Sequence, residues 1–193
     1  MQHADQNTGL LTAIAMTAAS LMIAQHIAGK ATRDALFLSH FEISDLPKAM
    51  MISAAVSVVA VLAMSRLLAR HGPARLIPPL YLASAALLAG QWVLTDIMPT
   101  AAAAALYLHV AALNSILISG FWSVINERFD PYAAKRVIAR LTAAATFGGL
   151  LGGLAAKGMA TIADTNAILL MLSGMHLVCG LGVGYLARGA PQD

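Results

Sequence analysis

Charged residues are scarce in this sequence. Asp, Glu, Lys and Arg together make up 11% of the 193 residues, whereas they make up about 25% of an ordinary soluble domain. Hydrophobic residues account for 59% of the chain, and the mean hydropathy is +0.75. Because so few charges cannot cover a water-exposed surface, the composition predicts an integral membrane protein whose first partner is the lipid bilayer.

Other absences narrow the class further. The only cysteine, Cys179, cannot form an intrachain disulfide. The segment MQHADQNTG precedes the first apolar run without a Lys or Arg, so we expect no cleaved signal peptide. The net charge of +3 comes mainly from arginines in predicted turns. A nucleic-acid partner would need a clustered basic surface on a soluble domain, so we expect none.

Catalytic motifs are missing as well. The chain contains no Gly-x-Ser-x-Gly, His-Glu-x-x-His or Gly-x-x-x-x-Gly-Lys-Ser/Thr sequence. We therefore expect no enzyme activity, no catalytic residue and no cofactor. His176 and Cys179 lie about one helical turn apart, but a metal site needs more ligands than these two. We predict that both side chains pack in a core and that there is no metal site.

Apolar segments separated by short turns organise the chain. Each segment is long enough to cross a bilayer, and the turns contain Gly, Pro or charged residues. The sequence thus predicts an all-α fold, a polytopic membrane bundle of six transmembrane helices that forms one domain over residues 1–193. The predicted spans are approximately 10–40, 47–68, 76–95, 101–126, 137–162 and 167–187.

The distribution of turn cations predicts the orientation. With an even number of spans, both termini share one side with the second–third and fourth–fifth turns. That side holds Arg66, Arg70, Arg75, Arg128, Lys135, Arg136, Arg140 and Arg188, and the other side holds only Lys48 and Lys157. Because cytoplasmic loops carry the excess of Lys and Arg, we expect both termini in the cytoplasm.

The first span carries charges in its second half. His26, Lys30 and Arg33 are spaced i, i+4 and i+7, so the two cations share a helix face, with Asp34 beside them. Ionisable residues inside a span normally face a bundle interior or a wet cavity, which favours a functional cluster. The alternative is that Lys30 and Asp34 form an i, i+4 ion pair that simply ends the helix.

Two further patterns concern helix packing. Ser115, Ser119, Trp122 and Asn126 share one face of the fourth span, which indicates either interhelical hydrogen bonds or a cavity lining. Gly148, Gly149, Gly152 and Gly153 give two overlapping Gly-x-x-x-Gly spacings in the fifth span, and Gly180 and Gly184 repeat that spacing in the sixth. Such glycines predict close approach of a neighbouring helix backbone.

The two halves of the chain echo each other. TRDALF near the end of the first span is matched by NERFDP at the end of the fourth, and each is followed by a Pro-led helix start, at Pro47 and Pro131. With three spans per half, such a repeat is inverted. This is the 3+3 arrangement found in each six-span half of major-facilitator transporters.

AGKATRDALFL (28–38) and GFWSVINERFDPYAAKRVIARLTAAATFGGLLGGL (120–154) carry a family resemblance. Over roughly residues 25–160 the chain resembles the ATP/ADP antiporters, the nucleotide transporter family related to the major facilitator superfamily. The resemblance implies two six-span halves around a cavity in which basic residues hold phosphates. It implies Lys30, Arg33 and Glu127 as cavity or gate residues, a second six-span half or a homodimer as partner, and the bacterial inner membrane as location.

Two functional hypotheses follow. The first is a transporter or half-transporter of an anionic solute, with a nucleotide as candidate, whose substrate-binding residues are Lys30, Arg33, Asp34, Asn126 and Glu127. The alternative is a non-transporting membrane module that anchors or assembles a partner protein.

Overall fold

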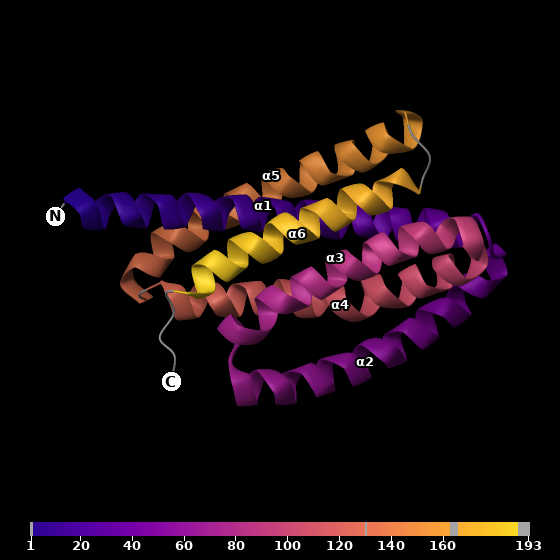
Figure 1. Ribbon diagram of the computed structural model, residues 1–193, viewed down its shortest axis with the longest axis horizontal. Coiled ribbons are helices and arrows are strands. Elements are labelled where there is room, and N and C mark those ends of the chain that lie inside the picture. Colours follow the sequence, from indigo (N-terminus) through magenta and orange to yellow (C-terminus); the bar gives the residue numbers. More distant parts are fainter. Residues whose placement is uncertain (1, 130, 163–165, 189–193) are drawn as a thin grey trace.

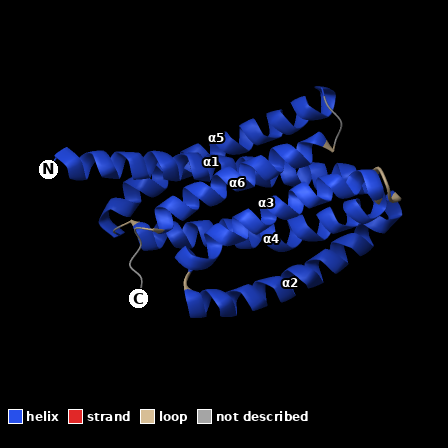
Figure 2. Ribbon diagram, in the orientation of Figure 1, coloured by secondary structure: helices blue, strands red, loops and turns tan. Residues whose placement is uncertain are grey.

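The chain folds into a bundle of long antiparallel helices (Figures 1 and 2). The computed structural model describes residues 2–129, 131–162 and 166–188, with side chains for 9–129, 137–161 and 166–188. Within these ranges every regular element is helical (Figure 2). The elements are α1 (Gln2–Leu38), the 3-10 turn η1 (Ile43–Asp45), α2 (Leu46–His71), α3 (Pro73–Ile97), α4 (Pro99–Arg128), α5 (Pro131–Ile162) and α6 (Ala167–Ala187).

The predicted fold class is confirmed. The described part of the chain contains six helices long and apolar enough to cross a bilayer, so the protein is a polytopic integral membrane protein. Figure 1 shows the chain passing back and forth, with both ends of the drawn helical chain, the α2–α3 turn and the α4–α5 turn at one end of the bundle. We call this the basic end, because the turn arginines gather there.

Proline and glycine set the helix boundaries. A proline occupies the first turn of α2, α3 and α4, where its missing N–H has no intrahelical partner. Gly72 has a φ of 74°, which a residue without a Cβ adopts freely, so α2 ends and α3 begins across this one residue. Met98 likewise separates α3 from α4. The helices therefore run a few residues past most of the predicted spans, whereas α1 ends at Leu38, before the expected 40.

Helix packing follows the predicted inverted repeat. α1 packs on α5 and α6, and α4 packs on α2 and α3. If the two halves are exchanged, α1 with α4, α2 with α5 and α3 with α6, the α1–α5 contact corresponds to the α4–α2 contact. The α1–α6 contact likewise corresponds to the α4–α3 contact. The remaining large contacts, α3 on α6 and α1 on α4, are unchanged by that exchange. This pattern is the one expected of two three-helix units related by a pseudo-two-fold axis.

The glycine stripe of α5 lies against α1. A Cβ added at Gly148 would overlap the backbone of Ser20, and one added at Gly152 would overlap the backbone of Ala24. Close approach of a neighbouring backbone is therefore confirmed, with α1 as the neighbour. Gly149 and Gly153 lie to the side: an added Cβ would meet only side-chain atoms of Ile23 or Ile27, at 3.2 Å or more.

Two buried clusters run through α1, α3, α4, α5 and α6. His176 and Cys179 lie inside, at 4% and 0% exposure, as the packed-core interpretation predicted. By contrast, Ser53 is the one buried residue in α2. Figure 1 shows α2 along one edge of the bundle and α5 along the opposite edge. Most of the α2 surface is apolar and exposed, so it faces lipid or a partner.

A buried polar network joins α3 to α4. His109 Nδ1 lies 3.1 Å from Gln91 Oε1, and Ser84 Oγ lies 2.9 Å from His109 Nε2. Because an amide oxygen only accepts, His109 Nδ1 donates to Gln91, and Nε2 shares a hydrogen bond with the Ser84 hydroxyl. The network ties His109 of α4 to two residues of α3.

Candidate functional site

Two adjoining pockets share Arg33. The first, which we call the α1–α4 pocket, has a volume of about 490 Å³. It is lined by His26, Lys30, Arg33, Val110, Ala111, Asn114, Ser115, Ile118 and Ser119. The second, the α2 pocket, has about 260 Å³ and lies between Arg33, Asp34 and Tyr107 on one side and α2 residues from Leu46 to Ser57 on the other.

Helix geometry brings the cations of α1 to the first pocket. His26, Lys30 and Arg33 all line it, as their i, i+4, i+7 spacing predicted. Ser115 and Ser119 line the opposite wall on α4, so the structure places these two serines on a cavity lining. Trp122, from the same predicted face, instead packs edge-on against Phe121 at 5.5 Å and against the core.

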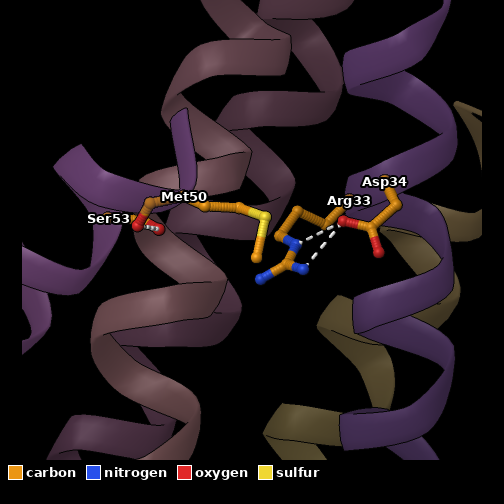
Figure 3. A network of polar contacts seen from close by, with 4 residues as sticks. All are labelled: Arg33, Asp34, Met50 and Ser53. Atoms are coloured by element: carbon orange, nitrogen blue, oxygen red, sulfur yellow. Dashed lines mark hydrogen bonds and ion pairs between the residues drawn. The ribbon is translucent and has the colours of Figure 1, made fainter. Parts of the chain in front are cut away.

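Arg33 is held by two groups. Its Nε and Nη2 donate to the same carboxylate oxygen of Asp34, at 2.8 and 2.7 Å. Its guanidinium carbon also lies 4.4 Å from the centre of the Tyr107 ring, a cation–π distance. Figure 3 shows the guanidinium between Asp34 of α1 and the Met50 side chain of α2. The Arg33 side chain is 17% exposed, so it is largely removed from water.

The ion pair differs from the alternative considered from the sequence. Asp34 pairs with Arg33, its immediate neighbour, and the proposed Lys30–Asp34 pair is not formed. The arginine side chain is long enough to reach the carboxylate of the next residue. The sequence argument considered only pairs three or four residues apart, which share a helix face. Among the described residues Lys30 has no ion-pair partner and is exposed to the pocket.

Aromatic rings form one wall beside Arg33. Phe37 stacks on Phe41 with ring centres 4.4 Å apart and lies 4.9 Å from the Tyr107 ring. Phe37 and Tyr107 are buried, at 4% and 2% exposure. Phe37 thus packs against the Tyr107 ring, and Tyr107 in turn contacts the Arg33 guanidinium.

Polar atoms near the α1–α4 pocket lack partners. Within the described residues His26 Nδ1 and Asn114 Nδ2, which belong to two lining residues, are buried and make no hydrogen bond. Asn114 is 9% exposed. Such groups cost free energy unless something pairs with them, typically about 1–3 kcal/mol each. The pocket therefore presents hydrogen-bonding groups that a polar solute can satisfy.

Not every predicted site residue lies here. Lys30, Arg33 and Asp34 come together, but Asn126 and Glu127 lie at the basic end of α4, where both are exposed. Glu127 lines a different hollow, with Arg70, Arg75 and Arg188. α1 and α4 run in opposite directions, so the C-terminal end of α1 and the C-terminal end of α4 lie at opposite ends of the bundle (Figure 1).

Sequence reasoning missed Tyr107 and Asn114. The two are seven residues apart on α4, with Val110 and Ala111 between them, and this spacing places them on one helix face. A search for polar and aromatic residues at that spacing could have found them. Their meeting with Arg33 depends on the pairing of α1 with α4.

Comparisons with protein-family models, with curated proteins and with solved structures found no match. The resemblance to the ATP/ADP antiporters therefore stays a prediction.

Proposed function

We propose that this chain is one half of a membrane transporter for an anionic solute, with the α1–α4 pocket as its solute site. One observation carries the proposal: Lys30 and Arg33 face the same pocket as unpartnered groups of His26 and Asn114. A nucleotide is the first candidate solute, on the strength of the sequence resemblance. The same resemblance leads us to propose the bacterial inner membrane as its location, and the distribution of turn cations leads us to propose that both termini are cytoplasmic.

The electrostatics of the pocket favour an anion. Two cations on one face repel each other and are costly to desolvate, while Asp34, beside the pocket, is paired with Arg33 and leaves the charge of Lys30 uncompensated among the described residues. An incoming phosphate or carboxylate offsets the remaining positive charge. Arg33 supplies a planar fork for such a group, and Lys30 adds a mobile point charge. The anion and Asp34 then compete for the same guanidinium.

Pocket size agrees with a small organic solute. A volume of about 490 Å³ falls within the range of roughly 300–1,000 Å³ typical of small-molecule sites. The pocket is formed by α1 and α4, equivalent helices of the two repeat units. Alternating access around such a site requires two halves. We therefore propose a second six-span half, or a second copy of this chain, as the partner.

The alternative function is a non-transporting module that assembles a partner protein. The exposed apolar surface of α2 favours it, because a partner could cover that surface. Such a module would have no use for the unpartnered polar groups near Lys30 and Arg33. Solute binding therefore separates the two functions.

The test is a thermal-unfolding screen of the purified chain with ATP, ADP, inorganic phosphate and succinate, with uncharged adenosine for comparison. We expect at least one anion to raise the unfolding temperature by several degrees, and adenosine alone to have no effect. Arg33→Gln should abolish the shift, whereas Arg66→Gln, an exposed change on α2 outside the pocket, should leave it intact. Equal shifts in both variants, or no shift with any anion, would favour the assembly module.

A further inference from the structure

A third, larger hollow lies at the basic end of the bundle, between α3 and α6. Its volume is about 990 Å³. We call it the α3–α6 groove, and neither wall includes a residue of the α1–α4 pocket. Its lining divides into an apolar part along the helices and a charged part at their ends.

The apolar part runs along the membrane-spanning surface. Pro78, Pro79 and Leu82 of α3 form one wall, and Gly180, Leu181 and Gly184 of α6 form the other. The two glycines let the helices pack closely here, since a Cβ added at Gly180 would lie 2.9 Å from Leu82 and one added at Gly184 would lie 3.5 Å from Pro78. Leu82 and Leu181 are 38% and 62% exposed. This part of the groove is therefore a shallow surface on which Leu82 and Leu181 present apolar atoms.

The charged part closes the groove at the bundle end. Arg70 from the end of α2, Arg75 from the start of α3 and Arg188 after α6 all line it, and all are exposed. Among the side chains that the structure describes, Glu127 is the one carboxylate in the lining, so cations outnumber acids there. Tyr185 is 47% exposed beside them, as expected of an aromatic residue at the membrane–water boundary.

We propose that the α3–α6 groove binds one anionic phospholipid, with its phosphate on Arg70, Arg75 and Arg188 and an acyl chain against the exposed Leu82 and Leu181. The groove matches a phospholipid in both charge and depth. Its cations lie at the membrane–water boundary, where a phosphate lies, and its apolar residues lie deeper in the membrane, where an acyl chain lies. Basic pockets between spanning helices on the cytoplasmic side hold lipid head groups in this way. The orientation proposed above puts this end in the cytoplasmic leaflet. A free anion would leave the apolar walls unused.

The experiment is native mass spectrometry of the full chain with phosphatidylglycerol or phosphatidylcholine of identical acyl chains. We expect one phosphatidylglycerol to be retained in preference to phosphatidylcholine. Because each basic residue near the surface contributes about fivefold to anionic lipid binding, Arg75→Gln combined with Arg188→Gln should weaken retention by roughly twenty-five-fold. Leu181→Gln should weaken it too, since it removes apolar contact from an exposed position.

Three results would overturn the proposal. One is equal retention of the two lipids; another is an equal loss in Arg66→Gln, which lies outside the groove at the same end of the bundle. The third is displacement of the lipid by inorganic phosphate, which would indicate a site for a soluble anion. Arg33→Gln, which alters the α1–α4 pocket and not the groove, should leave lipid retention unchanged. The lipid proposal can therefore be rejected or supported independently of the proposed solute site.

Discussion

The guanidinium carbon of Arg33 lies 4.4 Å from the centre of the Tyr107 ring, which ties a cation of α1 to an aromatic face of α4. The two residues are far apart in the sequence, and the contact exists only because α1 packs along α4. It fixes the direction of the guanidinium in the pocket that we propose as the solute site. An arginine oriented in advance loses less side-chain freedom when a solute binds.

This relationship gives the first prediction. Tyr107→Leu removes the ring and releases Arg33, so anion binding should weaken about two- to tenfold, the equivalent of immobilising one long side chain. Tyr107→Phe keeps the ring and is the matched control. The measurement is the anion-dependent shift in unfolding temperature across a concentration series. Equal weakening in both variants would show that the hydroxyl, and not the ring, matters.

Lys30 and Asp34 give the second prediction. Lys30 has no ion-pair partner among the described residues, so Lys30→Gln should change the free energy of unfolding by less than about 0.5 kcal/mol. Anion binding should nevertheless weaken. Asp34→Asn frees Arg33 and should strengthen anion binding. If Lys30→Gln destabilised the protein and Asp34→Asn restored its stability, the two residues would form a structural pair after all.

The third prediction concerns the contact of α5 with α1. Gly148→Ala or Gly152→Ala adds an atom where the α1 backbone lies, so each should destabilise the protein by about 1–3 kcal/mol. Gly153→Ala is the control, because its added Cβ would lie 3.9 Å from the nearest Ile27 atom. Thermal unfolding in detergent measures the difference. Equal unfolding temperatures for Gly152→Ala and Gly153→Ala would mean that the helices do not approach so closely.

The fourth prediction concerns the network around His109. Ser84→Ala removes the hydrogen-bond partner of His109 Nε2 and should lower the free energy of unfolding by about 0.6 kcal/mol, the average for hydrogen bonds between membrane helices, and by no more than about 1.7 kcal/mol. Ser65→Ala is the control, since that exposed hydroxyl donates only to Leu62 of its own helix. A double-mutant cycle of Ser84→Ala with Gln91→Leu should give non-additive changes. Strict additivity would argue against a shared network.

The fifth prediction concerns orientation. In a Cys179→Ala background, an impermeant thiol reagent added to intact cells should label Ser44→Cys but not His71→Cys. Both positions are exposed, at opposite ends of the bundle. His71→Cys should become reactive once the cells are permeabilised. The reverse pattern of labelling would place both termini outside the cytoplasm.

The fold was predictable because each span is a single apolar run ended by proline, glycine or charge. Boundaries were less predictable. Hydropathy falls before a helix ends, so it did not reveal that α3 begins at Pro73 and continues to Ile97. The glycine stripe was read correctly, but its contact residues, Gly148 and Gly152, depend on how α5 is rotated against α1.

The site was predictable only on the α1 side. Lys30, Arg33 and Asp34 stood out because charges inside a span are costly. Tyr107 and Asn114 are unremarkable residues for a membrane helix, and they join the site through tertiary pairing of α1 with α4. Glu127 was grouped with Lys30 through family resemblance. Consecutive spans alternate in direction, so α1 and α4 are antiparallel, and residues near the C-terminal ends of these two helices lie far apart.

The absence of glycine from α2 has a consequence for how the bundle comes apart. α5 and α2 are equivalent by the repeat, yet α5 touches the α1 backbone through Gly148 and Gly152, whereas α2 reaches α4 through the Ser57 hydroxyl on the Ala111 carbonyl. Separating α2 from α4 therefore breaks fewer close contacts than separating α5 from α1. Local opening begins where such contacts are sparse. We therefore expect α2, which forms one wall of the pocket beside Arg33, to separate from the bundle before α5 separates from α1.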